Sequence, residues 1–149
     1  MKLVMQRVNQ ASCTVDDKIV GEIQHGYVIL VGISSEDTKE IVEKMAKKAM
    51  DLRIFDDEAG KMNRSIEDVG GKVLSISQFT LYADCRKGRR PGFEQAAKPE
   101  FANELYQYFN QCIVNRGIHV EEGVFQAQMY ISLVNDGPVT IVLDSKEIC

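Results

Sequence analysis

Three short segments carry the side chains that could take part in chemistry, and each departs from the pattern of the chain around it. The first is Ser77-Gln78-Phe79-Thr80, where polar side chains close a run that alternates like a β-strand. Hydroxyl and backbone N–H groups at the end of a strand can face a ligand and stabilise an oxyanion, and Thr80 is a conceivable nucleophile. The same residues also fit ordinary alternation on a surface strand, so the pattern leaves both interpretations open.

A hydroxyl nucleophile needs a base, and the sequence offers no obvious partner for Thr80. The chain contains no G-x-S-x-G segment, and its two histidines, His25 and His119, fall in a predicted turn and a predicted strand. A serine-hydrolase mechanism is therefore disfavoured, and neither histidine receives a role.

The second segment is Asn135-Asp136-Gly137-Pro138-Val139-Thr140, between two apolar runs. Asn, Asp, Gly and Pro are the residues expected in a hairpin turn, which is the simpler interpretation. The alternative is that the Gly-Pro bond holds its backbone carbonyls in a fixed outward direction, where they act as a steric gate.

The third segment is the loop Arg86-Lys87-Gly88-Arg89-Arg90-Pro91-Gly92-Phe93. Four cations within five residues beside an aromatic ring suit contact with a phosphate backbone, although a solvated surface loop would look similar. The whole chain is acidic, with a formal net charge of -4, which argues against a general nucleic-acid coat and against a DNA partner. A local RNA contact through this loop remains open.

Composition limits the remaining classes of function. The 149 residues are enough for one domain, residues 1–149, with a core that needs neither disulfides nor a structural metal. The longest apolar run, 27–31, is too short to cross a bilayer, and the polar amino terminus does not resemble a signal peptide. We therefore expect a cytoplasmic protein without a membrane partner. The four cysteines form no C-x-x-C pair, so we expect reduced thiols, no metal site and no cofactor.

Hydrophobic periodicity predicts a β-rich chain with two main helices. The first helix should span about 38–50, with Asp37 and Glu40 forming a capping box, and the second should begin at Pro99 and stop at Asn115-Arg116-Gly117. The strands predicted before the first helix form a three-stranded meander, with turns at 16–18 and 24–26. Later strands are predicted at 52–55, 73–79, 118–121, 129–134 and 139–143, the last two forming a hairpin. The order predicts an α+β or mixed α/β fold with helices packed on sheet.

The motifs Ser77-Gln78-Phe79-Thr80 and Gly137-Pro138-Val139-Thr140, in this order and with the Lys87–Pro91 loop between them, resemble the D-aminoacyl-tRNA deacylase family. The opening residues 1–8 and the strand 26–32 share the likeness, so it runs essentially end to end. The resemblance implies a deacylase-type, β-barrel-like fold and a cytoplasmic homodimer. It also implies hydrolysis of the ester that joins a D-amino acid to the 3′ end of tRNA, with glycyl-tRNA as a further substrate.

The resemblance also implies roles for individual residues. Ser77, Gln78, Phe79 and Thr80 of one subunit would form the catalytic segment, and Gly137-Pro138 of the other would insert a cis peptide. The carbonyls of Gly137 and Pro138 would reject L side chains, so that proofreading reads handedness through the main chain. Supporting contacts would come from Arg7, bonded to those carbonyls, and from Val139 and Thr140. Contacts to tRNA would come from Arg86, Lys87, Arg89 and Arg90.

Two mechanisms remain open for ester cleavage. We favour a positioned water, an oxyanion bound by N–H groups near Phe79 and Thr80, and assistance from the ribose 2′-hydroxyl. Thr80 as a covalent nucleophile is the competing account. The rival functions are a non-catalytic tRNA-binding module, an L-aminoacyl editing domain like that of archaeal threonyl-tRNA synthetases, and a Thr-dependent peptidase or esterase.

Overall fold

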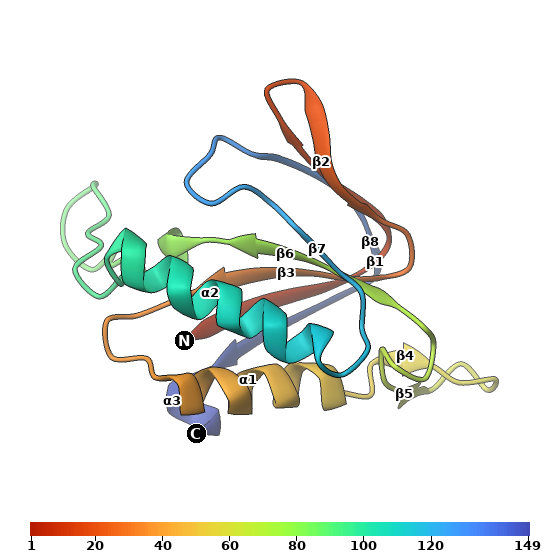
Figure 1. Ribbon diagram of the computed structural model, residues 1–149. Helices are drawn as coiled ribbons and strands as arrows, with labels where there is room; N and C mark the ends of the chain where they lie inside the picture. The colour runs from red at the N-terminus through yellow and green to blue at the C-terminus, as the bar shows by residue number, and fades with distance from the viewer.

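The computed structural model describes residues 1–149 as a curved sheet with helices on one side (Figure 1). The strands are β1 (Lys2–Val15), β2 (Lys18–Ile23), β3 (Gly26–Gly32), β4 (Phe55–Asp56), β5 (Met62–Arg64), β6 (Lys72–Ser77), β7 (Val120–Glu122) and β8 (Tyr130–Asp144). The helices are α1 (Lys39–Asp51), the 3-10 helix η1 (Phe79–Tyr82), α2 (Pro99–Val114) and α3 (Ser145–Ile148). The predicted α+β class and the two main helices are confirmed.

The main sheet has the order β2-β1-β3-β6-β7, and β8 pairs with β1. The pairs β3–β6 and β6–β7 are parallel, and the other pairs of this sheet are antiparallel. The sheet curls until its two ends, β2 and β7, come into contact. The approach is close, since a Cβ placed on Gly21 of β2 would lie 2.9 Å from the carbonyl oxygen of Glu122 in β7. The resulting nearly closed, barrel-like sheet confirms the fold that the resemblance implied.

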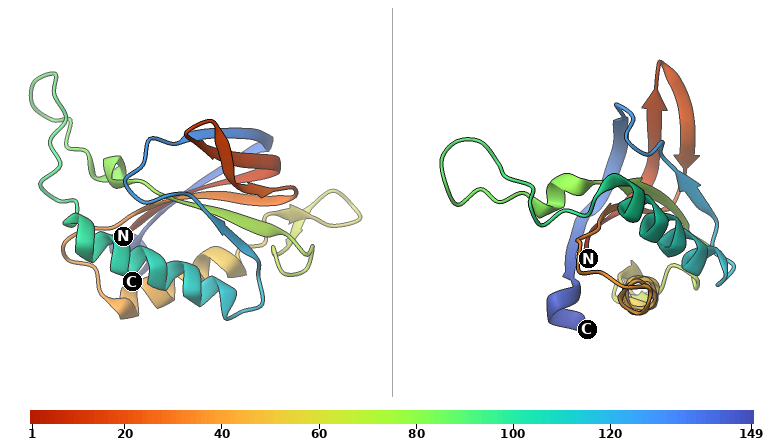
Figure 2. Two further views of the ribbon diagram at one scale, coloured as in Figure 1. Left: turned by 45° about the horizontal axis from the view of Figure 1, so that its top comes forward. Right: turned by 60° about the vertical axis from the view of Figure 1, so that its left-hand side comes forward.

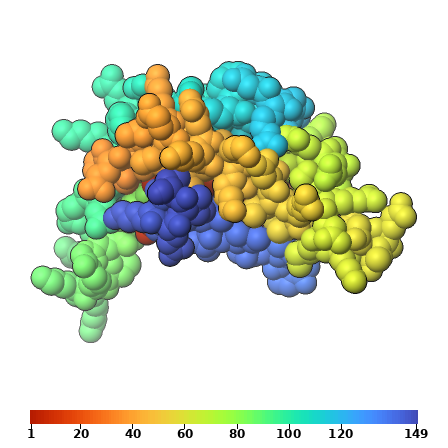
Figure 3. All heavy atoms as spheres, turned by 90° about the horizontal axis from the view of Figure 1, so that it is seen from below, coloured from red at the N-terminus to blue at the C-terminus, as the bar shows by residue number.

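Apolar side chains fill both faces of this sheet. The larger core of 24 buried residues lies between the sheet and helices α1 and α2, which run side by side (Figures 1 and 2). The smaller core, centred on Val8, Val28 and Leu74, fills the space enclosed where β1 and β2 curl over β3 and β6. The short α3 packs on α1 (Figure 3). No helix is long and apolar enough to cross a membrane.

Two predictions about strand pairing were wrong, and the length of β1 explains both. The first three strands do not form a meander, because β1 pairs with β3 along residues 2–8 and with β2 along residues 11–15. The segment 129–143 is not a hairpin either, because β8 runs through it and pairs with β1 over nearly its full length. The turn-like residues 135–138 are accommodated as an irregularity, where the register shifts opposite Val8.

Several element boundaries also differ from the prediction. Asp37 is not the helix cap: Thr38 caps α1, while Asp37 binds the Met1 ammonium group and the backbone N–H of Ser34. The strand predicted at 52–55 is reduced to the two residues of β4, which pair with the unpredicted β5. The strand that begins near Val73 ends at Ser77, because residues 79–82 turn into η1.

Candidate functional site

Ser77, Gln78 and Phe79 lie where β6 ends and the chain turns into η1. The N–H of Gln78 donates to the carbonyl oxygen of Val31 at 2.8 Å, which extends the pairing with β3 by one residue. The turn then rests on Gly32, since a Cβ at that position would lie 2.9 Å from the Cβ of Leu81. Neighbouring backbone therefore fixes this segment.

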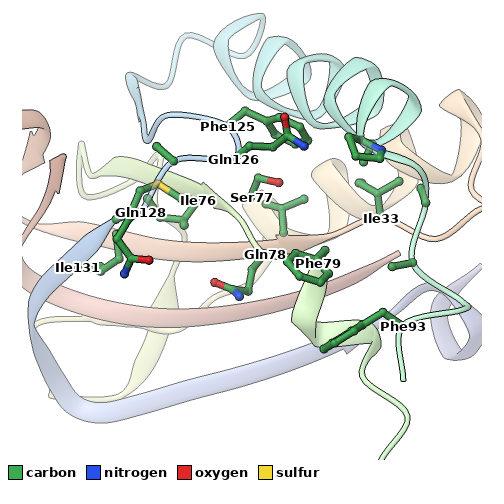
Figure 4. Close-up of a pocket in the computed structure, with 17 residues that line it drawn as sticks. Ile33, Ile76, Ser77, Gln78, Phe79, Phe93, Phe125, Gln126, Gln128 and Ile131 are labelled. Atoms are coloured by element: carbon green, nitrogen blue, oxygen red, sulfur yellow. The ribbon is translucent and has the colours of Figure 1, made fainter. Parts of the chain in front are cut away.

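These residues border a cavity of about 680 Å³. Figure 4 shows residues from the end of β6, from the segment around Phe93, from the 125–128 segment and from β8 gathered around it. The lining consists of Val31, Ile33, Ile76, Ser77, Gln78, Phe79, Phe93, Ala96, Ala97, Pro99, Ala102, Phe125, Gln126, Ala127, Gln128, Met129 and Ile131. None of these side chains ionises, so hydroxyl, amide and backbone groups are the polar groups that one chain presents to the cavity.

Thr80 lies just outside the lining. It is exposed, and its hydroxyl accepts a hydrogen bond from the side-chain amide of Gln78. Phe79 and Thr80 are the first residues of η1, where backbone N–H groups have no acceptor within the helix. The end of β6 thus offers N–H donors beside an apolar cavity without a side-chain base.

Aromatic rings border the cavity on two sides. Phe79, which is 55% exposed, meets Phe93 edge to face with the ring centroids 5.0 Å apart. On the opposite side, Phe125 lies near Tyr106, whose hydroxyl donates to the carbonyl oxygen of Ser75 at 2.8 Å. The pKa of Tyr106 is raised because its phenol is buried, so it remains neutral at physiological pH.

The sequence did not indicate the wall formed by residues 125–128, between the predicted strands 118–121 and 129–134. This stretch has neither strand alternation nor a turn signature, and Gln126 adopts a left-handed backbone with φ 65°. Its two ends, at β7 and β8, were predicted as strands. The one signal that could have revealed the wall is an apolar pair, Phe125 and Met129, in a segment that is otherwise polar or small.

Gly137 and Pro138 lie in the middle of β8, are exposed and are joined by a cis peptide bond. They do not line the cavity of their own chain. Gly137 is level with Arg7, Tyr27 and Val73 on the intervening strands. Three strand spacings of about 4.8 Å and a stagger of about four residues separate it from Ser77 by roughly 20 Å along the sheet. Within one chain, the two predicted motifs are not brought together.

Arg7 is buried, and its guanidinium lies next to Gly137. Its Nη1 donates to the carbonyl oxygen of Ile54 at 2.7 Å, and its guanidinium forms ion pairs with Asp136 at 3.1 Å and Asp56 at 3.4 Å. The expected hydrogen bonds to the carbonyls of Gly137 and Pro138 are not formed. Arg7 instead reaches this segment through the Asp136 carboxylate and by close packing, since a Cβ on Gly137 would lie 3.4 Å from Nη2.

The two other residues predicted to support this segment follow it in β8. Val139 is partly buried and packs on the larger core. Thr140 is exposed, and its hydroxyl donates to the side-chain oxygen of Asn135 at 3.2 Å.

The basic loop projects from the body of the molecule between η1 and α2 (Figure 2). Backbone hydrogen bonds of 2.7 and 2.9 Å between Asp84 and Gly92 close its base. Arg86 donates to both carboxylate oxygens of Asp84, and these bonds lower the pKa of Asp84 to about 2. The other three cations, Lys87, Arg89 and Arg90, are exposed and form no ion pair within the chain. They are free to meet an anionic partner.

The side chains that could support metal or redox chemistry are His, Cys, Asp and Glu, and they do not cluster. No group of three or more His, Cys, Asp or Glu side chains is placed to hold a metal ion. All four cysteines are free, with Cys13 buried and Cys85 and Cys149 exposed.

Comparisons with known proteins give a consistent result. A sequence model of the family described as D-Tyr-tRNA(Tyr) deacylase matches residues 4–144. The D-aminoacyl-tRNA deacylase of Bacillus cytotoxicus (strain DSM 22905 / CIP 110041 / 391-98 / NVH 391-98) is 59% identical over 146 residues, which cover 98% of this chain and 100% of the relative. The protein of the same name from Bacillus thuringiensis (strain Al Hakam) is 57% identical with the same coverage.

Two solved structures are also similar. One, described as c-Myc DNA Unwinding Element Binding Protein, has a TM-score of 0.91 and 39% identity, covering 97% of this chain and 98% of that one. The other, described as a probable eukaryotic D-amino acid tRNA deacylase, has a TM-score of 0.85 over 95% of this chain and 97% of that one. At 18% identity, the second likeness concerns the fold alone.

Proposed function

Because the chain belongs to the D-Tyr-tRNA(Tyr) deacylase family, we propose that it hydrolyses the ester of D-aminoacyl-tRNA and releases free D-amino acid and tRNA. The observation that carries the proposal is the identity of 57–59% to D-aminoacyl-tRNA deacylases along their whole length. Residues 1–149 act as one deacylase domain, glycyl-tRNA is a second substrate, and L-aminoacyl esters are spared. The reaction takes place in the cytoplasm, where aminoacyl-tRNA is used.

The cavity at the end of β6 suits this reaction. An aminoacyl ester is activated, so it needs a positioned water and an oxyanion site more than a strong side-chain base. The N–H groups of Phe79 and Thr80 receive the oxyanion, and the substrate's own 2′-hydroxyl assists the attack. The absence of ionisable side chains from the lining supports this mechanism over one that relies on a base from the same chain.

A homodimer completes the site. Gly137 and Pro138 are exposed on β8 and far from their own cavity, so they are available to enter the cavity of a second copy. The outer face of β8 also exposes three apolar side chains, Tyr130, Val134 and Val142. A long edge strand with exposed apolar residues favours pairing with another chain, and a two-fold dimer buries the same patch from both copies.

The inserted segment acts as a chiral gate, defined here as Gly137 and Pro138 of the partner subunit. Its main-chain atoms occupy the volume that an L side chain would need, whereas a D side chain points elsewhere and glycine has none. A thousandfold preference for D over L requires only about 4 kcal/mol of differential transition-state energy, which one steric clash can supply.

The basic loop binds the tRNA. Lys87, Arg89 and Arg90 are unpaired and sit on a loop whose last residue, Phe93, lines the cavity, so a nucleic-acid backbone on the loop leads toward the site. Duplex DNA is a second candidate for this loop, since the 39% identical structure is described as a DNA-binding protein. Competition of tRNA binding by duplex DNA at fixed salt distinguishes the two, and we expect tRNA to bind more tightly.

The direct test is release of labelled amino acid from D-tyrosyl-tRNA, L-tyrosyl-tRNA, glycyl-tRNA and L-seryl-tRNA, with catalytic amounts of protein. We expect rapid loss of the D-tyrosyl and glycyl esters while both L esters survive. Loss of L-serine alone would identify an L-aminoacyl editing domain. Binding of tRNA without cleavage of any ester would leave a binding module.

A further inference from the structure

The side chain of Asn135 bridges the irregularity that carries Gly137 and Pro138. Its amide nitrogen donates to the carbonyl oxygens of Arg7 at 2.9 Å and Val139 at 3.0 Å. Its oxygen accepts from the amide of Gln6 at 3.1 Å and from the hydroxyl of Thr140 at 3.2 Å. An asparagine side chain has two donor hydrogens and two acceptor lone pairs, so all of its capacity is used.

These contacts replace strand pairing where it is interrupted. The ladder between β1 and β8 pairs Gln6 with Thr140 and Val8 with Asn135, so the four residues 136–139 of β8 face only Arg7. Within this gap, the carboxamide joins Arg7 on β1 to Val139, the residue that follows the gate. One side chain, that of Asn135 at the start of the gap, therefore connects its far end at Val139 to β1.

A second contact acts in the same place. The carboxylate of Asp136 lies 3.1 Å from the Nε of Arg7, whose side chain is only 7% exposed. The guanidinium in turn packs against Gly137. Side chains rather than backbone pairing therefore fix the gate relative to the sheet.

We propose that Asn135 is a positioning residue that sets the projection of the Gly137–Pro138 gate and thereby the discrimination between D and L esters. This inference rests on the proposed function. Asn135 does not touch the substrate; it acts by holding the main chain that does. Nothing in the sequence pattern separates this role from that of a turn asparagine, because two of the four partners, Gln6 and Arg7, lie on β1, far from Asn135 in the sequence.

The test uses Asn135→Asp, which keeps the shape of the side chain and removes both donor hydrogens. Its carboxylate would face the carbonyl oxygens of Arg7 and Val139, so the contacts that hold Val139 become repulsive. The matched control is Asn9→Asp, which adds the same charge to β1 at an exposed asparagine that forms no side-chain hydrogen bond. Asn135→Ser, a second variant, keeps one donor and adds no charge.

For Asn135→Asp, we expect the ratio of kcat/KM for D-tyrosyl-tRNA to that for L-tyrosyl-tRNA to fall at least tenfold, with measurable cleavage of the L ester. Asn135→Ser should lie between this variant and the wild type, and Asn9→Asp should match the wild type. Equal loss of both activities, with the ratio unchanged in a folded protein, would overturn the proposal because it indicates a purely structural role.

Amide hydrogen exchange gives a readout that does not depend on activity. Exchange in the peptide that contains residues 136–141 should be at least tenfold faster in Asn135→Asp than in Asn9→Asp. If the wild type cleaves no ester, the proposed function fails, and faster exchange still supports the positioning of this segment by Asn135. Unchanged exchange overturns the inference whatever the activity of the wild type.

Discussion

The two predicted motifs are built in opposite ways. The segment 77–80 borders the cavity and is called the concave segment here. It is supported by backbone, because β6 pairs with β3 and Gly32 lies beneath the turn. No side chain from another element forms a hydrogen bond to it. The segment 136–139 is exposed on β8 and is called the convex segment here. It is supported by the side chains of Asn135 and of Arg7 with its carboxylate partners. One segment lies beside a cavity, while the other is exposed to solvent.

The difference indicates which substitutions each segment tolerates. A site made of backbone N–H groups loses little when a nearby side chain is shortened, because the donors remain where the sheet puts them. A segment held by side chains and by a left-handed glycine loses its position when one of those groups changes. Substitutions should therefore have their largest effects around Gly137 and their smallest at Thr80.

The substitution Gly137→Ala should cause the largest loss. Gly137 has φ 117°, and a Cβ there would lie 2.7 Å from the backbone nitrogen of Val139, so the segment must shift. We expect kcat/KM for D-tyrosyl-tRNA to fall about 100-fold, the effect of misplacing a site by about 1 Å. The measurement is steady-state deacylation at a temperature well below the midpoint of unfolding.

The matched control for this prediction is Gly60→Ala in the loop between β4 and β5. Gly60 also has a positive φ, 76°, but nothing lies within 4 Å of its added Cβ. It should lose some stability, about 1 kcal/mol, and keep its activity. If Gly137→Ala behaves like Gly60→Ala, the projection of the segment does not matter for the reaction.

Val142→Asp tests whether the convex segment works only in a second copy. Val142 is 66% exposed on β8, so a carboxylate there is harmless in a monomer but would be buried without a partner in a β8-to-β8 dimer. We expect a monomer in analytical ultracentrifugation and at least a tenfold loss of activity at micromolar protein. Met62→Asp, at a 54% exposed position on β5, should remain dimeric and active. A fully active monomer would show that one chain completes its own site.

Asp136→Asn should have a moderate effect. It removes the charge opposite the buried Nε of Arg7, while Ile54 and Asp56 still hold the other end of the guanidinium. Since Asp136 is about one-third exposed, we expect the ratio of D to L cleavage to fall about threefold to tenfold, or ~0.7–1.4 kcal/mol. Glu58→Gln, which removes a charge from a 95% exposed side chain in the loop between β4 and β5, should leave the ratio unchanged.

The same contrast explains how much the sequence could predict. Local signals were sufficient for α2, with Pro99 at its start, and for the start of β6 near Val73, although the strand ends at Ser77 and not at the predicted residue 79. They failed for β8, because Asn135-Asp136-Gly137-Pro138 has turn chemistry and only the long β1 beside it keeps the strand continuous. The partners of Arg7 were also beyond reach, since Ile54, Asp56 and Asp136 come from distant parts of the chain. Contacts between distant segments fixed both of these missed features.

Thr80→Ala should have the smallest effect. It tests whether the concave segment, residues 77–80, acts through its backbone or through a side chain. The hydroxyl of Thr80 accepts from Gln78 and lies outside the cavity lining, whereas the N–H of residue 80 is retained in the variant. Losing one exposed hydrogen bond should change kcat by no more than about threefold, and Thr80→Ser should match the wild type. Loss of several orders of magnitude in Thr80→Ala, with dimerisation and tRNA affinity intact and activity kept in Thr80→Ser, would instead make the hydroxyl the covalent nucleophile. In that case, the concave segment would depend on a side chain as much as the convex one does.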